Sequence, residues 1–159
     1  MKIVVDAVPP VVGTLYPEPY DAPCRNRERR KLGDAAGLTQ FGVNLLTLPP
    51  GAWSSQRHWH TDSDELVYVI EGEVTLVTDK GAEIRRAGDA AGFKAGNANG
   101  HHLQNRSESR AVVIEVGTRV SSDACNYPGI DLFAPPGEKP AMFTHRDSTP
   151  YPNRPRTSK

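Results

Sequence analysis

The stretch Gly51–Gly72, GAWSSQRHWHTDSDELVYVIEG, carries the clearest structural pattern in the chain. Its second half, from Glu65 to Ile70, is apolar on both alternating faces apart from Glu65 itself. An antiparallel strand with one face in water would alternate apolar and polar residues. We therefore predict a strand covered by a barrel interior on one side and by a second subunit or the N-terminal arm on the other, and hence a homodimer. The two faces hold Leu66, Tyr68 and Ile70 on one side, and Val67 and Val69 on the other.

Short strand candidates continue on both sides of this stretch and are separated by turn residues such as Asp79-Lys80-Gly81 and Gly88-Asp89. A spacing of about 8–12 residues between successive strands favours an antiparallel barrel or sandwich. The predicted strands are Phe41–Leu48, Trp53–His60, Glu65–Glu71, Glu73–Thr78, Glu83–Arg86, His101–Asn105 and Arg110–Val116.

The composition excludes several classes of protein. With 14 Gly and 14 Pro, the chain has too many helix breakers for a coiled coil or a helical bundle. Lys plus Arg and Asp plus Glu are equal at 19 each, which argues against a nucleic-acid partner held by a positive field. No apolar stretch approaches the length that spans a bilayer, so no membrane partner is expected. Proline crowds the two ends, which predicts one domain (1–159) with a barrel core (41–117), a Pro-rich N-terminal arm (1–40) and a Pro-rich C-terminal arm (118–159).

The start of the chain, MKIVVDAVPP, is too short in apolar residues for a signal-peptide core, so a cytoplasmic location is expected. In that compartment Cys24 and Cys125 are expected to be free thiols rather than a disulfide or a redox pair. The basic run Arg25–Lys31 (RNRERRK) is interpreted as a solvated surface turn. A patch that binds phosphate or carboxylate is the alternative.

Four of the five histidines fall into two tight groups, His58-Trp59-His60 and His101-His102. Residues i and i+2 of a strand share a face about 6.5–7 Å apart, so His58 and His60 can converge on one metal ion. Glu65 starts the next strand after a short turn, which makes a divalent metal site plausible. A third histidine would come from the downstream group. The alternative is an exposed histidine pair that binds no metal.

These residues resemble a known family. The pattern Gly51-x6-His58-x-His60-x4-Glu65-x6-Gly72 resembles the first motif of the cupin superfamily. The segment Gly88–Asn105 is similar to the second motif, with Gly96 at the turn and a closing His101-x3-Asn105. The flanking segments also resemble a group of small bacterial single-domain cupins with an RmlC-like jelly roll.

The resemblance implies an all-β fold, a single cupin-type double-stranded β-helix with irregular arms. It also implies one divalent ion (Mn, Fe, Ni, Co or Zn) held by His58, His60, Glu65 and His101. The closing motif selects His101 over His102, and strand alternation agrees, because His101 and Asn105 share a face. Further residues expected around the metal or in the substrate pocket are Gln56, Tyr68, Asn99, His102 and Asn105.

Three functions remain open. The first is a metal-dependent enzyme that acts on a small organic acid or sugar-like molecule as a dioxygenase, decarboxylase or isomerase, as the resemblance implies. The second is a non-catalytic cupin that binds a small molecule. The third is a sugar-phosphate isomerase, which needs a cationic anchor for the phosphate. Arg57, Lys94 and the Arg25–Lys31 run are the candidates for that anchor.

Overall fold

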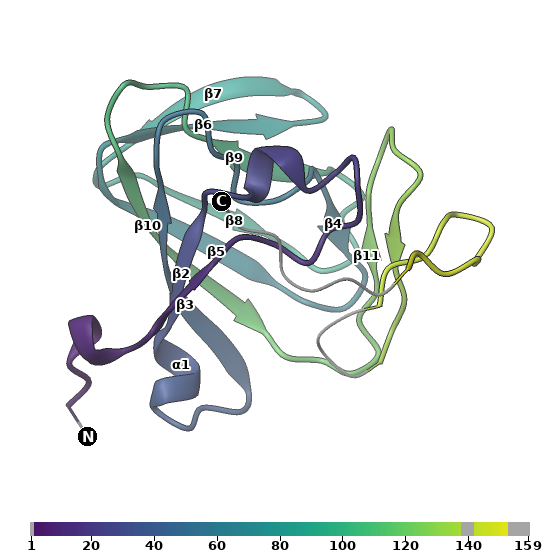
Figure 1. Ribbon diagram of the computed structural model, residues 1–159, viewed down its shortest axis with the longest axis horizontal. Helices are drawn as coiled ribbons and strands as arrows, with labels where there is room; N and C mark the ends of the chain where they lie inside the picture. The colour runs from purple at the N-terminus through teal and green to yellow at the C-terminus, as the bar shows by residue number, and fades with distance from the viewer. Residues whose placement is uncertain (1, 138–141, 153–159) are drawn as a thin grey trace.

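Antiparallel strands make up almost all of the regular structure in the computed structural model, as the sequence predicts (Figure 1). The structure describes residues 2–137 and 142–152, so the end of the expected C-terminal arm (153–159) lies outside it. None of the helices within these residues is long and apolar enough to cross a membrane. The strands are β1 (Pro10–Val12), β2 (Glu28–Lys31), β3 (Phe41–Leu48), β4 (Trp59–His60), β5 (Glu65–Glu71), β6 (Glu73–Thr78), β7 (Gly81–Arg86), β8 (Ala90–Phe93), β9 (His101–Gln104), β10 (Ala111–Thr118), β11 (Cys125–Asn126) and β12 (Phe133–Ala134). The helical turns are η1 (Val5–Ala7), η2 (Ala22–Cys24) and α1 (Leu32–Ala35).

The strands form three sheets, in the orders β1-β2-β3-β10-β5-β8, β7-β6-β9 and β12-β11-β4. The main hydrophobic core is formed between the sheets β1-β2-β3-β10-β5-β8 and β7-β6-β9. Leu46 and Val113 come from the first sheet, and Leu76 and Leu103 from the second. Val113 pairs with Leu46 on β3 and with Val69 on β5, so these side chains form one inward row. The jelly-roll architecture follows from this packing of two antiparallel layers around one core.

Both arms contribute short strands, so they are less irregular than expected. The N-terminal strands β1 and β2 extend the large sheet beyond β3, and the C-terminal strand β11 pairs with β4 on one side and with β12 on the other. Pro10 opens the edge strand β1, where its missing N–H removes no central ladder bond. A second apolar cluster joins the two arms and includes both cysteines, which are buried and, as expected, not joined to each other by a disulfide.

The basic run does not form the solvated turn expected from its charge. Residues Glu28–Lys31 form β2, and Arg27 is only 7% exposed. Arg29 pairs with the core residue Leu46 and therefore faces inward, whereas Arg30 pairs with Leu45 and faces outward. Alternation along one strand thus sends alternate members of the run into the protein.

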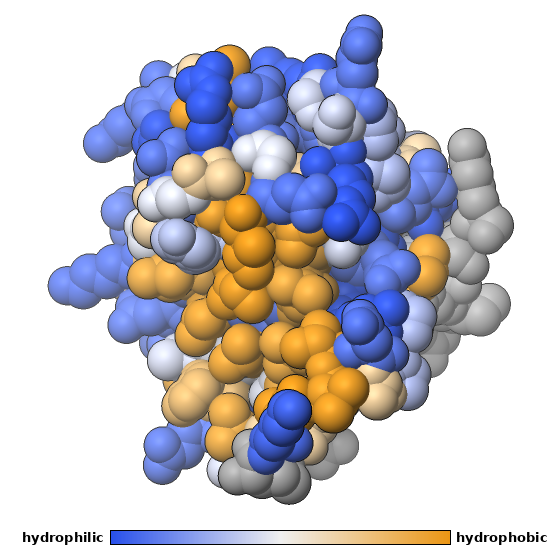
Figure 2. Space-filling model, turned by 90° about the vertical axis from the view of Figure 1, so that its left-hand side faces the viewer, coloured by the Kyte–Doolittle hydropathy of each residue, from blue (hydrophilic) through white to orange (hydrophobic). Residues whose placement is uncertain are grey.

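The outer face of β5 is apolar and open. Leu66, Tyr68 and Ile70 are 44–46% exposed, whereas Val69 on the other face is buried in the core. The N-terminal arm does not cover this face, because β1 and β2 join the far edge of the sheet next to β3. Figure 2, which views the left-hand side of Figure 1, shows a broad apolar surface on the molecule. The N-terminal arm is therefore excluded as the partner of this face, and a second subunit that covers it remains a prediction.

Candidate metal centre and its cavity

A cavity of about 880 Å³ runs along the inner face of the large sheet. Its wall is made by inward residues of β2, β3, β5 and β10, by β9, and by the segment 54–60. This volume lies within the range of about 300–1,000 Å³ that is typical of small-molecule sites. All four expected ligands, His58, His60, Glu65 and His101, line it.

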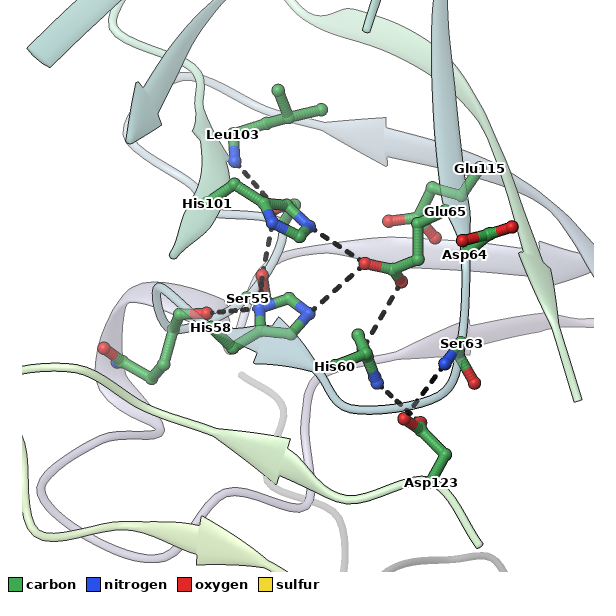
Figure 3. A network of polar contacts seen from close by, with 12 residues as sticks. Ser55, His58, His60, Ser63, Asp64, Glu65, His101, Leu103, Glu115 and Asp123 are labelled. Carbon is green, nitrogen blue, oxygen red and sulfur yellow. Dashed lines mark hydrogen bonds and ion pairs between the residues drawn. The ribbon is translucent and has the colours of Figure 1, made fainter. Parts of the chain in front are cut away.

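The three histidines converge on the carboxylate of Glu65 (Figure 3). Nε2 of His101 lies 2.9 Å from Oε2 of Glu65, and Nε2 of His58 lies 3.7 Å from the same oxygen. Nε2 of His60 lies 3.6 Å from the other oxygen, Oε1. One ligand atom each from His58, Glu65 and His101 lie within 4.8 Å of one another. One ion could therefore contact all three of these groups.

Local backbone pairing brings the two histidine motifs together. His58 and His101 form an antiparallel bridge, in which each N–H donates to the other carbonyl, at 3.1 and 2.8 Å. The i and i+2 spacing then sets the ring centroids of His58 and His60 5.0 Å apart. The ring of Phe93 stacks on His101 at a centroid distance of 3.5 Å, which restricts the rotation of that imidazole.

Hydrogen bonds at Nδ1 orient two of the imidazoles. Nδ1 of His58 lies 2.8 Å from the carbonyl oxygen of Gln56, and Nδ1 of His60 lies 2.7 Å from Oδ2 of Asp123. An Nδ1–H donated to these oxygens leaves the Nε2 lone pair free on the side of Glu65. Asp123 was not expected from the sequence, because it lies in the C-terminal arm, far along the chain from both motifs.

The electrostatics of the cluster suit a divalent cation. Burial lowers the pKa of His58 to about 3 against the opposing charge of Glu65, so its imidazole is neutral at physiological pH. Burial alone would raise the pKa of Glu65, but the hydrogen bond from His101 and the nearby imidazoles lower it to about 2. Neutral imidazoles and an ionised carboxylate are the forms that bind a borderline divalent metal. The residues present therefore fit the ion that the sequence implies.

Comparison with known proteins agrees with this geometry. The Cupin domain family matches residues 44–117. A solved protein from Silicibacter pomeroyi, described as a sugar phosphate isomerase from a cupin superfamily, is 39% identical, with a TM-score of 0.90 over 96% of this chain and 97% of that one. This chain belongs to the cupin superfamily. No curated protein matches it by sequence.

Two further solved cupins show how far the similarity extends. A protein from Acidithiobacillus ferrooxidans, described as a candidate sugar phosphate isomerase, is 26% identical, with a TM-score of 0.71 over 82% of this chain and 83% of that one. A Thermotoga maritima protein described as a predicted oxalate decarboxylase is 18% identical, with a TM-score of 0.61 over 76% of this chain and 100% of that one. The second similarity concerns the fold alone.

His102, the second histidine of the downstream pair, makes different contacts from His101. The ring nitrogens of His102 lie 2.9 Å from the carbonyl oxygen of Ser55 and 2.9 Å from Nε2 of Gln104, so both are engaged within the protein. Burial lowers the pKa of His102 to about 4, which keeps the ring neutral. His102 lines the cavity, but His101 is the member of the pair that contacts Glu65.

Two residues expected in the pocket lie outside the cavity. Tyr68 shares the outer face of β5 with Leu66, because side chains of a strand alternate, and it is 44% exposed. Asn99 lies in the loop before β9, where its side-chain oxygen accepts a hydrogen bond from the backbone N–H of Asp79 at 3.1 Å. The prediction of a pocket role for both residues is corrected by these positions.

The side chains of two other expected pocket residues form hydrogen bonds with the backbone instead. The amide of Gln56 donates to the carbonyl of Tyr20 at 2.6 Å, and its contribution to the site is the backbone oxygen that accepts from His58. Asn105 is 1% exposed, and its amide donates to the carbonyls of Leu48 and Ser109, both at 2.7 Å. Neither side chain lines the cavity, and each is engaged in hydrogen bonds to backbone carbonyl groups.

Of the three candidate anion anchors, only the basic run reaches the cavity. Arg57 forms an ion pair with Asp79, and Lys94 is exposed outside the cavity wall. Arg27, Arg29 and Lys31 line the cavity together with the metal cluster. The positions of these side chains are therefore compatible with the alternative interpretation of the basic run, a patch that binds phosphate or carboxylate.

Proposed function

We propose that this cupin binds one divalent metal ion through His58, His60, Glu65 and His101, and uses it to interconvert an aldose and a ketose that carry a phosphate. The observation that carries the proposal is the convergence of three imidazoles on one carboxylate in the wall of a large cavity. The 39% identical relative, described as a sugar phosphate isomerase, supports the choice of reaction. The metal could be Mn, Fe, Ni, Co or Zn, since each accepts imidazole and carboxylate ligands.

The chemistry divides between the ion and the chain. When bound, a divalent ion would act as a Lewis acid that polarises a carbonyl or hydroxyl oxygen. Aldose–ketose interconversion also moves a proton between adjacent carbons, which requires a general base in the cavity. Glu115 is a carboxylate of the cavity wall outside the metal cluster, and Arg29 holds both of its oxygens, at 2.7 and 2.8 Å. Because Arg29 occupies both of its oxygens, we assign to Glu115 the positioning of Arg29 and not this proton transfer.

Metal analysis and a substrate screen test the proposal. Protein purified without added metal is analysed for its elements and then incubated with phosphorylated aldoses and ketoses, each with one of the five metals. Nuclear magnetic resonance should show interconversion by the wild type and by His145→Ala, a histidine outside the cavity wall that pairs with Asp131. His58→Ala and His101→Ala should abolish it.

The outcomes separate the alternative functions. Bound stoichiometric metal without interconversion for any substrate would reject the isomerase and leave the dioxygenase and decarboxylase reactions to be tested. If the wild type purifies free of metal and the variant His58→Ala stays folded, the protein would be identified as a non-catalytic binding cupin instead.

We also propose that two copies of this cupin associate through the outer face of β5, since exposed apolar surface of this kind is typical of protein–protein contacts. A cytoplasmic location fits two buried cysteines that no disulfide joins to each other, because a reducing compartment disfavours disulfides.

A further inference from the structure

Outside the metal cluster, the side chains that line the cavity carry an excess of positive charge. Its described cations are Arg27, Arg29, Lys31 and Arg119, and its carboxylates outside the metal cluster are Asp34 and Glu115. Arg29 pairs with Glu115, while Lys31 and Arg119 share Asp34. Four cations and two carboxylates leave an excess of two positive charges, separate from any charge of the ion.

Arg27 is the least compensated of these cations. It is 7% exposed, and in the described part of the chain its donors reach neutral oxygens, those of Gly13, Thr14 and Ser54. Among the described residues, no carboxylate lies within 4.0 Å of it. Burial lowers the pKa of Arg27 to about 10, so the guanidinium keeps its charge at neutral pH. A buried charge without a counter-ion is costly, which indicates that the site is completed by an anion.

The second arginine lies beside the first. Nη1 of Arg27 and Nη2 of Arg29 both donate to the carbonyl oxygen of Ser54, so the two guanidinium groups meet at one atom. Within residues 2–137 and 142–152, the single carboxylate in contact with this pair is Glu115. Two adjacent guanidinium groups with one carboxylate leave a net positive charge at one point of the wall, which suits an oxyanion such as phosphate or carboxylate.

We propose that Arg27 and Arg29, here called the arginine wall, bind the phosphate group of the substrate while its sugar part extends toward Glu65 and the histidines. The excess of two positive charges matches a phosphate monoester, which carries about −1.5 to −2 at pH 7. Lys31 and Arg119 are more exposed, with 51% and 39% of their side chains accessible, and would attract the anion toward the cavity. This inference rests on the proposed function for the nature of the substrate, but the arginine wall does not require the metal.

The alternative is that Arg27 serves the fold alone, by tying the turn at Gly13 and Thr14 to Ser54. A purely structural arginine would leave the affinity of the cavity for anions unchanged when it is replaced. The two roles therefore differ in anion binding rather than in stability, and anion binding is the property to measure.

Isothermal titration calorimetry of the metal-free protein with inorganic phosphate tests the arginine wall, because the chelated protein has no ion to bind phosphate. Arg27→Gln is compared with Arg30→Gln, the matched control. Arg30 lies on the same strand but faces outward, where it donates to the carbonyls of Asp6 and Val8. Since a hydrogen bond between a guanidinium and a phosphate oxygen is charge-assisted and strong, Arg27→Gln should weaken phosphate binding about tenfold or more. Arg30→Gln should bind phosphate like the wild type.

Two further measurements keep the test decisive. Should Arg27→Gln fail to fold by circular dichroism, Arg27→Lys keeps the charge but loses the fork, and should still weaken phosphate binding relative to Arg30→Gln. A parallel titration with acetate identifies the anion, and acetate binding in the absence of phosphate binding would overturn the phosphate assignment.

Failure of the arginine wall is distinguishable from failure of the proposed function. A wild type that binds metal but no phosphate at millimolar concentration would overturn the arginine wall and leave the metal centre intact. Equal phosphate affinity in Arg27→Gln and Arg30→Gln would overturn it as well. Phosphate binding that depends on Arg27, in a protein without metal affinity, would support the wall and reject the metal-dependent reaction.

Discussion

Replacing Asp123 by asparagine should weaken metal binding, because this buried carboxylate controls which nitrogen of His60 is protonated. Its Oδ1 accepts hydrogen bonds from the backbone N–H groups of Asp62 and Ser63, at 3.0 and 3.2 Å, and its Oδ2 lies 2.7 Å from Nδ1 of His60. In Asp123→Asn, the two backbone donors keep the amide oxygen at the Oδ1 position. The amide NH2 group then faces Nδ1 of His60.

The consequence is a change of tautomer at one ligand. An NH2 group needs an acceptor, so Nδ1 of His60 must be unprotonated, and the ring proton moves to Nε2. Nε2 is the atom that lies 3.6 Å from Glu65 on the metal side, and a protonated Nε2 offers no lone pair to an ion. Loss of an outer partner of a metal ligand typically costs about 10–100-fold in affinity. For Asp123→Asn we expect this range, which corresponds to about 1.4–2.7 kcal/mol.

Competition against a chromogenic chelator measures the affinity directly. Asp62→Asn is the matched control, since Asp62 is an exposed carboxylate in the same loop and loses the same charge. The circular dichroism and the thermal unfolding of both variants show whether either has lost the fold. Equal metal affinity for Asp123→Asn and Asp62→Asn, in folded proteins, would refute the role assigned to the hydrogen bond of Asp123.

Three other perturbations test the core, the protonation of the site and the outer face. Leu46→Ala removes a fully buried side chain and should lower the free energy of unfolding in urea by about 2–5 kcal/mol, whereas an unchanged midpoint would exclude Leu46 from a packed core. Because burial lowers the pKa of His102 from 6.5 to about 4, only the unfolded chain takes up this proton between those values, so His102 should contribute a loss of about 3 kcal/mol to the metal-free protein as the pH falls from 6.5 to 4, in addition to the loss from His58. His102→Asn should flatten that dependence in urea titrations at several pH values, and an unaltered slope would contradict the assignment. Leu66→Arg introduces a charge on the open face of β5 and should convert a dimer into a folded monomer by light scattering, and a wild type that is already monomeric at micromolar concentration would end the dimer proposal.

Much of the barrel could be predicted from short-range patterns. The ranges Glu65–Glu71 and Glu73–Thr78 coincide with β5 and β6, because apolar runs between turn residues mark strand ends well. The range Trp53–His60 was predicted as one strand, but only Trp59–His60 forms a regular ladder, after isolated bridges at Trp53 and His58. The strand β8, with sequence AAGF, was missed because small residues give no alternation.

The site was predictable where it depends on spacing within one strand or one turn. His58, His60 and Glu65 are close in sequence, and strand parity places both histidines on the same side. Asp123 could not be found in this way, since its contact with His60 spans 63 residues of sequence. The outward position of Tyr68 follows from the same parity that places Val69 in the core, but the sequence alone does not say which face is inside.

The two halves of the cavity have different origins in the chain, and this bears on how substrates are assigned to cupins. The metal half comes from His58 and from β4, β5 and β9, inside the matched domain 44–117. The positive half comes from Arg27 and from Arg29 on β2, in the N-terminal arm and outside that domain. A chain that keeps the His and Glu spacing but lacks these arginines should still bind metal and should not select an anion. Under the proposed function, the charge of the substrate of this chain is therefore inferred from the arm strand β2, whereas the barrel motifs predict only the ion.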